Sequence, residues 1–340
     1  MKKIFLLTAL AVLLGVATAT AQQIAVVSEN GETSVFQTFQ AAIEGADPGS
    51  VIYLPGGSFS LPDAAKITKR LTIIGIGHRS DNDNVDGVTN ITSNLWFNEG
   101  SSGSAIMGCY VAGSLNIGEG ESAVNNILVR YCCLNKVQVL NSSCIGIQIN
   151  QNYIKNDSYF SGSSTEITNN IIRSILDVSN GHITHNIVTN YEHQGGAHWD
   201  TWVCIRANNT TIRNNVIIPD KVADYTGATY DYYYHIFHGS GNIIYNNLMK
   251  IDLGEEPINI GDVDWNDVFV NYNNAVISPM SDFHFKQNYK QYENICGIYA
   301  GTGFNDHQTA PVPYIVAKRI AEQTDAAGQL NIQVRVKAGN

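Results

Sequence analysis

The chain has 340 residues and a formal net charge of −10, and only 15% of its residues are charged. Nucleic-acid binding needs clustered lysine and arginine to neutralise phosphates, so this charge balance excludes nucleic acid as the expected partner. The hydrophobic content of 44% is regularly placed, which excludes a disordered chain and leaves room for one long domain or two ordinary ones.

The N-terminus has the three parts of a secretory signal peptide. Lys2 and Lys3 form a basic start, residues 4–16 are apolar, and Ala19-Thr20-Ala21 is a small-residue cleavage pattern. The apolar run is short for a membrane span, and no second run reaches that length. We therefore expect residues 1–21 to be a signal peptide and the mature protein to be secreted, periplasmic or on the cell surface.

Four elements are predicted after the cleavage site. Residues 24–27, 51–57 and 71–77 are apolar runs that indicate strands, the second of which ends in a Pro-Gly-Gly turn. Residues 35–43 are predicted to be a helix, because the apolar residues at 35, 36, 39, 42 and 43 share one helical face. Gly45 and Asp47-Pro48-Gly49 end that helix.

This opening resembles the N-terminal end of pectin-lyase-like right-handed parallel β-helices. In that superfamily a short amphipathic helix precedes a strand that ends in proline and glycine, and a Leu-x-Ile-x-Gly strand follows. Residues 39–43, 49–57 and 71–77 carry the resemblance here. It implies a secreted bacterial solenoid whose helix covers the open end, although no compact signature of a specific enzyme family is present.

A short pattern then returns through the middle of the chain. Each copy has an aliphatic residue, two further residues, an Asn or Cys, and then an aliphatic pair or its equivalent. The fourth position falls at Cys109, Cys132, Asn152, Asn170, Asn186, Asn215 and Asn247. Coils of roughly twenty residues indicate a solenoid, and their β-branched and Asn-rich character favours a β-helix over leucine-rich or helical repeats.

The Asn at the fourth position is predicted to be structural. It falls where a strand turns a corner, and Asn tolerates unusual backbone angles there and bonds the local backbone. Stacked on successive coils, these side chains would form a ladder of amides. Cys109 and Cys132 share the inward position, which favours buried thiols over disulfides, and the six cysteines lack metal-type spacing.

The last third of the chain is less regular. Residues 268–270 indicate a final strand, Ser281–Phe285 resembles phrases that close many β-helices, and 297–303 is expected to be a linker. Residues 314–320 and 330–336 indicate two strands around a turn. The predicted fold is therefore all-β. It consists of a single-stranded right-handed parallel β-helix over residues 22–300 with an N-terminal capping helix, then a linker and C-terminal β-hairpin segment over 301–340.

Two long intervals point to the functional region, at residues 190–241. The extra residues begin four positions after Asn186 and four after Asn215, so both loops are expected to leave the solenoid at one corner, on neighbouring coils. They are rich in histidine, carboxylate and aromatic residues, which suit acid–base chemistry and stacking on sugars. The candidate catalytic residues are His193, His198, Asp200, Asp231 and His235, and the candidate substrate-binding residues are Trp199, Trp202, Arg206, Tyr225, Tyr230 and Tyr232.

Two reactions on a polysaccharide fit these residues. In β-elimination from a uronic acid, His193 or His198 is the base, Tyr225 or Tyr230 the acid, and Arg206 or Lys221 neutralises the carboxylate. In hydrolysis, Asp200 pairs with Asp224 or Asp231. Elimination is preferred, and the alternative is a non-catalytic glycan-binding or structural surface protein. No metal site is predicted, and a calcium requirement, the sugar, the linkage and the oligomeric state are left open.

Overall fold

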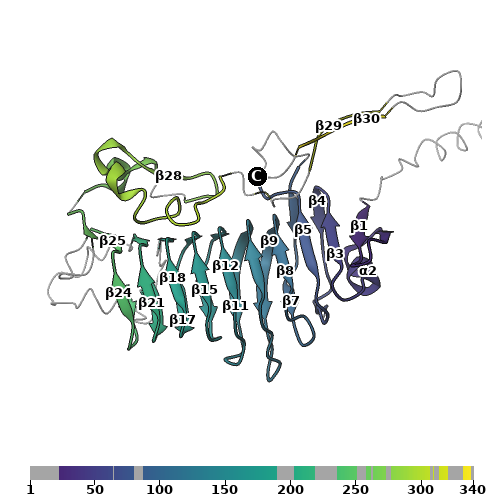
Figure 1. Cartoon of the computed structure of the whole chain (residues 1–340), viewed down its shortest axis with the longest axis horizontal. Coiled ribbons are helices and arrows are strands. Elements are labelled where there is room, and N and C mark those ends of the chain that lie inside the picture. Colours follow the sequence, from purple (N-terminus) through teal and green to yellow (C-terminus); the bar gives the residue numbers. More distant parts are fainter. Residues whose placement is uncertain are drawn as a thin grey trace, which may run out of the picture.

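A computed structural model describes residues 23–63, 65–79, 87–189, 203–218, 236–250, 258–261, 263–272, 277–306 and 309, and the strands 314–320 and 332–337. The chain is predominantly β, and its strands stack side by side along one long axis (Figure 1). Two long, mostly parallel sheets contain most of the described strands.

Sheet A is the first of these sheets, and its strands follow one another in chain order except at the N-terminal edge. Its first two pairings, β2 with β1 and β1 with β3, are antiparallel, and all later pairings are parallel. The strands are β2 (Thr33–Phe36), β1 (Ile24–Val27), β3 (Val51–Leu54), β5 (Thr72–Gly75), β8 (Ala105–Met107), β10 (Leu128–Arg130), β12 (Gln148–Asn150), β15 (Glu166–Thr168), β18 (His182–Thr184), β21 (Thr211–Arg213) and β24 (Ile243–Tyr245).

Sheet B contains two long strands, β9 (Tyr110–Ile117) and β11 (Cys133–Val139), and the two ends of each pair with different strands, so the sheet divides into two arms on both sides of them. On the N-terminal side, β4 (Gly57–Phe59) and β6 (Thr89–Ile91) continue from the first end of β9, and β7 (Leu95–Phe97) pairs with its second end. Arm B1 holds β13 (Tyr153–Ile154), β16 (Ile171–Ile172), β19 (Ile187–Val188), β22 (Val216–Ile217), β25 (Leu248–Met249) and β26 (Ile258–Asn259). Arm B2 holds β14 (Ser158–Phe160), β17 (Ile175–Ser179), β20 (Ile205–Asn208) and β23 (Phe237–His238).

Each central coil therefore contributes one strand to sheet A, one to arm B1 and one to arm B2. The coil from Glu166 to Ser179 supplies β15, β16 and β17, and the next supplies β18, β19 and β20. The registers are those that the repeat predicts, since Ile167 pairs with Ile183 and Ile171 with Ile187. This arrangement is consistent with a β-helix-like solenoid.

The helix at the N-terminal end is shorter than expected. Residues 39–45 form the helix α2 (Phe39–Gly45), capped by the Thr38 side chain, and it buries Phe39, Ala42 and Ile43. The prediction of helix at residues 35 and 36 is wrong, because Thr33–Phe36 is the edge strand β2. The β-branched Thr33 and Val35 suit a strand, and the N-cap at Thr38 sets the start of the helix beyond them.

The ladder of asparagine amides is confirmed at the corner between sheet A and arm B1. The Nδ2 atoms of Asn152, Asn170, Asn186 and Asn215 each donate to Oδ1 of the next Asn, at 3.0, 3.0, 2.9 and 2.8 Å. Cys132 occupies the position before Asn152, to whose Oδ1 its backbone N–H donates. All five ladder side chains are fully buried, so each amide is paired where an unpaired one would be costly.

The unusual backbone angle lies one residue earlier than expected. The left-handed conformation is adopted by the residue that precedes each ladder position, with φ between 53° and 58° at Gln151, Asn169, His185, Asn214 and Asn246. This corrects the prediction that the ladder Asn itself turns the corner. The turn residue points away from the core between the sheets, where Gln and His are also accommodated, whereas the ladder residue must supply an amide inside that core.

The C-terminal part of the stacked coils is covered by a segment that we call the strap, residues 258–306. It contains β26, the short helix α4 (Trp265–Val268), β27 (Phe269–Asn271), β28 (Asp282–Phe285) and the 3₁₀ helix η2 (Gln287–Tyr292). Figure 1 shows it along one side of the stacked strands. Its apolar side chains bury the outer row of arm B1, namely Cys133, Tyr153, Ile171, Ile187, Val216 and Leu248.

Residues 297–303, where a linker is expected, are bonded to the turn residues of the coils. Asn169 Nδ2 donates to the carbonyls of Ile298 and Ala300, both at 2.7 Å, and its Oδ1 accepts from Thr302. The backbone N–H of Gly297 donates to the backbone carbonyl of Asn214, and the backbone N–H of Asn305 donates to Oε1 of Gln151. The strap therefore runs back along the coils toward the N-terminal end.

The last strands and the cysteines agree with the sequence. Tyr314–Ile320 (β29) and Ile332–Lys337 (β30) form an antiparallel hairpin, and the final strand expected at 268–270 is β27, which pairs with β28. All six cysteines are free and buried. Cys132 belongs to the core between the sheets, whereas Cys133 faces the strap, as expected for neighbours on a strand.

Candidate functional site

The predicted site residues fall largely outside the described part of the chain. His193, His198, Trp199, Asp200 and Trp202 of the first long loop lie there, and so do Tyr225, Tyr230, Asp231, Tyr232 and His235 of the second. Arg206 is described, in strand β20 of arm B2. The site can therefore be built from the residues around the points where the two loops begin and end.

Those points are adjacent on neighbouring coils. The first loop begins after β19 and the second after β22, and these two strands pair through Ile187 with Val216 and Val188 with Ile217. The chain returns to β20 and β23, which pair through Ile205 with Phe237 and Arg206 with His238. Both loops thus join the solenoid at the corner between arms B1 and B2.

Arg206 is held by a carboxylate on the preceding coil. Its Nε lies 2.6 Å from Asp177 Oδ1, and its second contact, from Nη2 to Asp177 Oδ2, is 3.2 Å. Paired parallel bonds of this kind fix the plane of a guanidinium. About a third of each side chain is exposed, at 29% for Arg206 and 38% for Asp177, so solvent reaches part of both.

Asp177 sits on an irregularity of strand β17. The pairing with β20 shifts between Ile175 and Val178, and Asp177 has a φ of 65°. A left-handed Asp costs about 1–2 kcal/mol relative to extended backbone, and bulges of this type re-aim a side chain. The bulge turns the Asp177 carboxylate toward Arg206.

Arg206 belongs to a row of outward side chains along arm B2 and the strands before it. Pairing places its members on successive coils, about 4.8 Å apart, and their neighbours in each strand point into the core. Its partly or fully exposed members combine aromatic, amide and charged groups, a mixture that suits a sugar chain, whereas Asn116 and Leu176 are buried. Its members are Trp96, Asn116, Gln138, Tyr159, Leu176, Arg206 and His238.

A second ion pair stands at the corner beside this row. Arg173 Nε lies 3.3 Å from Asp157 Oδ1, which also accepts a hydrogen bond of 2.7 Å from the hydroxyl of Ser174. Arg173 and Ser174 occupy the turn between β16 and β17, one coil before the first long loop, and Asp157 occupies the equivalent turn between β13 and β14. The corner therefore carries two arginine–carboxylate pairs within the described residues.

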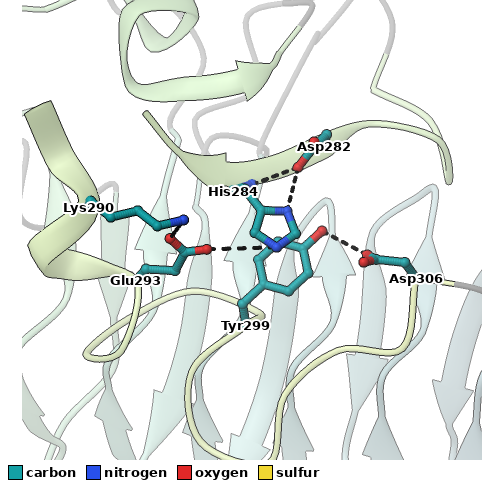
Figure 2. Close-up of polar contacts among 6 residues, drawn as sticks. All are labelled: Asp282, His284, Lys290, Glu293, Tyr299 and Asp306. Atoms are coloured by element: carbon teal, nitrogen blue, oxygen red, sulfur yellow. Dashed lines mark hydrogen bonds and ion pairs between the residues drawn. The ribbon is translucent and has the colours of Figure 1, made fainter. Parts of the chain in front are cut away.

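The strap holds a separate cluster of titratable groups, drawn in Figure 2. His284 Nδ1 lies 2.7 Å from Asp282 Oδ1, and its Nε2 is 3.7 Å from Glu293 Oε1. Glu293 also pairs with Lys290.

Tyr299 completes this cluster from below the imidazole. Its ring stacks on His284 at a centroid distance of 3.6 Å, and its hydroxyl donates to Asp306 Oδ1 at 2.8 Å. Burial, reinforced by Asp306, raises the pKa of Tyr299, so the phenol stays protonated. Arg79 donates to the Asp306 carbonyl and so ties the cluster to the N-terminal coils.

A His–carboxylate pair such as Asp282–His284 is able to transfer protons, but this pair lies on the strap and not in the row of arm B2. Its signal in the sequence is the alternation Asp282-Phe283-His284-Phe285, which places both phenylalanines on one face and the polar pair on the other. The phenylalanines are buried against arm B1. We read the cluster as the outer layer of the strap.

No protein-family model matches the chain, and the comparisons with curated proteins and with solved structures give no match either. The described residues contain no group of three or more His, Cys, Asp or Glu side chains arranged to hold a metal ion. Among them there is also no helix long and apolar enough to cross a membrane.

Proposed function

We propose that the chain is a secreted, single-stranded right-handed parallel β-helix that acts on a polysaccharide at the corner between arms B1 and B2. The observation that carries this proposal is the partly exposed Asp177–Arg206 pair, beside the adjacent ends of the two loops rich in histidine and aromatic residues. The resemblance of the N-terminal residues to pectin-lyase-like proteins supports the fold and the handedness.

The preferred reaction is β-elimination from a uronic acid unit. A base, His193 or His198, removes the proton from C5, and the electron pair forms the C4–C5 double bond. The bond from C4 to the glycosidic oxygen breaks, and an acid, Tyr225 or Tyr230, protonates that oxygen. Arg206 pairs with the sugar carboxylate, which stabilises the negative charge that develops beside C5.

Asp177 has a supporting role in this scheme. A guanidinium already fixed in its plane loses less conformational freedom when it binds a carboxylate. Lysine at position 206 keeps the charge but loses the two-pronged geometry. We therefore expect Arg206→Lys and Asp177→Asn to lower kcat/KM about 10-fold or more.

The test is an activity assay on a panel of acidic and neutral polysaccharides. Absorbance of the unsaturated product reports elimination, and new reducing ends without that absorbance report hydrolysis by Asp200 with Asp224 or Asp231. Arg213→Lys is the matched control, because Arg213 is exposed on sheet A, away from the corner. Activity that is equally unaffected by Arg206→Lys and Arg213→Lys would contradict the assigned role of Arg206.

A non-catalytic glycan-binding protein is the second candidate, and the outward row of arm B2 favours it. Trp96 and Tyr159 lie three coils apart in that row and offer ring faces to a sugar chain. Retention on immobilised polysaccharide, with no product from any substrate, would support this candidate over the enzyme. Tyr159→Ala should then weaken retention, whereas Tyr53→Ala, at an exposed tyrosine of sheet A, should not.

A further inference from the structure

The two end strands of sheet A are edges with exposed apolar side chains. Among the described residues, β2 is bonded to β1 alone and β24 to β21 alone. Val35 of β2 is 54% exposed and Ile243 of β24 is 62% exposed, which are large fractions for aliphatic side chains. Neither strand carries a charged residue, a proline or a bulge of the kind that protects sheet edges.

The two edges have the same direction. β2 is antiparallel to β1, and β1 is antiparallel to β3, so β2 is parallel to β3. Every pairing from β3 to β24 is parallel. The β2 edge of a second copy, placed end to end in the same orientation, would therefore continue the sheet as another parallel strand.

The backbone groups and the two faces also match. The Ile243 N–H and the Tyr245 carbonyl bond toward β21, so the N–H and carbonyl of Ile244 face the open side. On β2, Ser34 pairs with Val26 and Phe36 pairs with Ile24. The side chains of Val26 and Ile24 point to the core, so Ser34 and Phe36 lie on that same face of the sheet. A register with Val35 opposite Ile243 places Phe36 opposite Ile244, and each pair then shares one face.

We infer that copies of this chain associate head to tail, with β24 of one copy pairing with β2 of the next. This inference is independent of the proposed function. The contact is heterologous, because two different surfaces meet, and it leaves a new β24 edge open after each addition. The expected products are a series of oligomers that lengthen with protein concentration.

The test uses sedimentation velocity on the chain from Gln22 onward, with one charge placed on each edge. Val35→Lys blocks the β2 edge, and Ile243→Lys blocks the β24 edge. Each variant alone should remain monomeric, and an equimolar mixture should form a dimer that grows no further, since each copy has one intact edge. Val35→Glu and Ile243→Glu give a second pair, and Ile145→Lys, at a 52% exposed isoleucine on neither edge, is the control.

Three results would overturn the inference. The first is an unsubstituted chain that is monomeric at every concentration. The second is loss of association in only one of the two variants, which would indicate pairing between identical edges. The third is a mixture of the folded variants that forms no dimer. Unchanged circular dichroism and thermal midpoints establish that the variants are folded.

Discussion

The Nδ2 atom of Asn170 donates to Oδ1 of Asn186 at 3.0 Å, and the same oxygen accepts the backbone N–H of Asn170 at 2.9 Å. One amide oxygen on one coil therefore satisfies two donors of the coil before it. The Nδ2 of Asn186 in turn donates to Asn215 and to the carbonyl of Ile167. Each ladder residue thus joins three coils.

Replacement of Asn186 by alanine should be strongly destabilising. It leaves two donors of Asn170 and the carbonyl of Ile167 without their partner in a fully buried site, and unsatisfied buried groups cost about 1–3 kcal/mol each. We expect the free energy of unfolding to fall by about 3 kcal/mol or more in denaturant titrations. Asn156→Ala removes a similar amide bond, to Asn135, at a partly exposed corner, and should cost about 1 kcal/mol. Equal losses in the two variants would contradict the ladder's importance.

Replacement of Asn169 should detach the strap without unfolding the coils. Asn169→Ala removes the bonds to Ile298, Ala300 and Thr302 and also places alanine at a φ of 53°. Cys133 lies beneath the strap and Cys296 belongs to it, both in one buried cluster, and burial raises the pKa of each thiol to about 12. Both should react with a thiol reagent faster in this variant than in the unsubstituted chain.

Asn169→Gly separates the two effects of that change. Glycine adopts a positive φ without strain, so the glycine variant should be about 1 kcal/mol more stable than the alanine variant. It should still label at Cys133 and Cys296, because it lacks the same three bonds. Labelling that follows stability, and not the presence of the side-chain amide, would argue against the strap contacts.

Glycine is required at position 301 for two reasons, the backbone angle and the lack of space for a Cβ atom. Comparison of Gly301→Ala with Gly303→Ala distinguishes them. Gly301 has a φ of 65°, and a Cβ there would lie 2.9 Å from His185 Nδ1 and 3.0 Å from its Cε1. Gly303 has a φ of 77°, but the nearest atom to a Cβ is 4.0 Å away. Gly303→Ala should cost about 1–2 kcal/mol for the left-handed backbone alone. Gly301→Ala should cost about 1–3 kcal/mol more, measured by equilibrium unfolding and by exposure of Cys296.

His185 makes the coil–strap contact sensitive to acid. Burial, with a smaller contribution from Arg213, lowers the pKa of His185, and Asn214 Nδ2 lies 3.1 Å from its Nε2 and donates to it. Because the folded pKa is below the unfolded value of about 6.5, the unfolded state binds more protons as pH falls. The stability contributed by neutral His185 is present above that value and is lost below it, down to the folded pKa.

This pH dependence can be measured by denaturant titration at pH 7.5 and at lower pH. His185→Gln should reduce the loss of stability between those conditions, because its side chain has no proton to gain. The control is His182→Gln, at an exposed histidine of the same coil, which should leave the difference as in the unsubstituted chain. An unchanged difference in His185→Gln would rule out this histidine as the source.

The repeat predicted the coils well because its aliphatic positions map directly onto paired strands. Ile149, Ile167, Ile183, Ile212 and Ile244 do pair in sequence within sheet A. The left-handed residue was assigned one position late because Asn169-Asn170 and Asn214-Asn215 are both double asparagines. Propensity alone does not say which Asn turns and which is buried, whereas Gln151 and His185 show that the left-handed conformation at the turn position does not require asparagine.

The strap was not predicted because it has no period of its own. The sequence nevertheless indicates that another segment covers arm B1, because its strands have two consecutive aliphatic residues, such as Ile171-Ile172 and Val216-Ile217. A strand that is apolar at consecutive positions is buried on both faces. The site residues in the two long loops stay predictions, since Arg206 is the one member of that set within the described residues, and its partner Asp177 had no distinguishing signal in the sequence.

The outer row of arm B1 places a limit on how this chain can change in length. A solenoid accepts an extra coil wherever its inner face continues, but here each coil from Tyr153 to Leu248 also presents an apolar residue to a strap of fixed length. The returning part of the strap runs from Gly297, which is bonded to Asn214, to Asn305, which is bonded to Gln151. A coil inserted between those two points would break the match between the turn residues and the strap residues that bond to them. The length of the strap therefore limits the number of coils that it can cover.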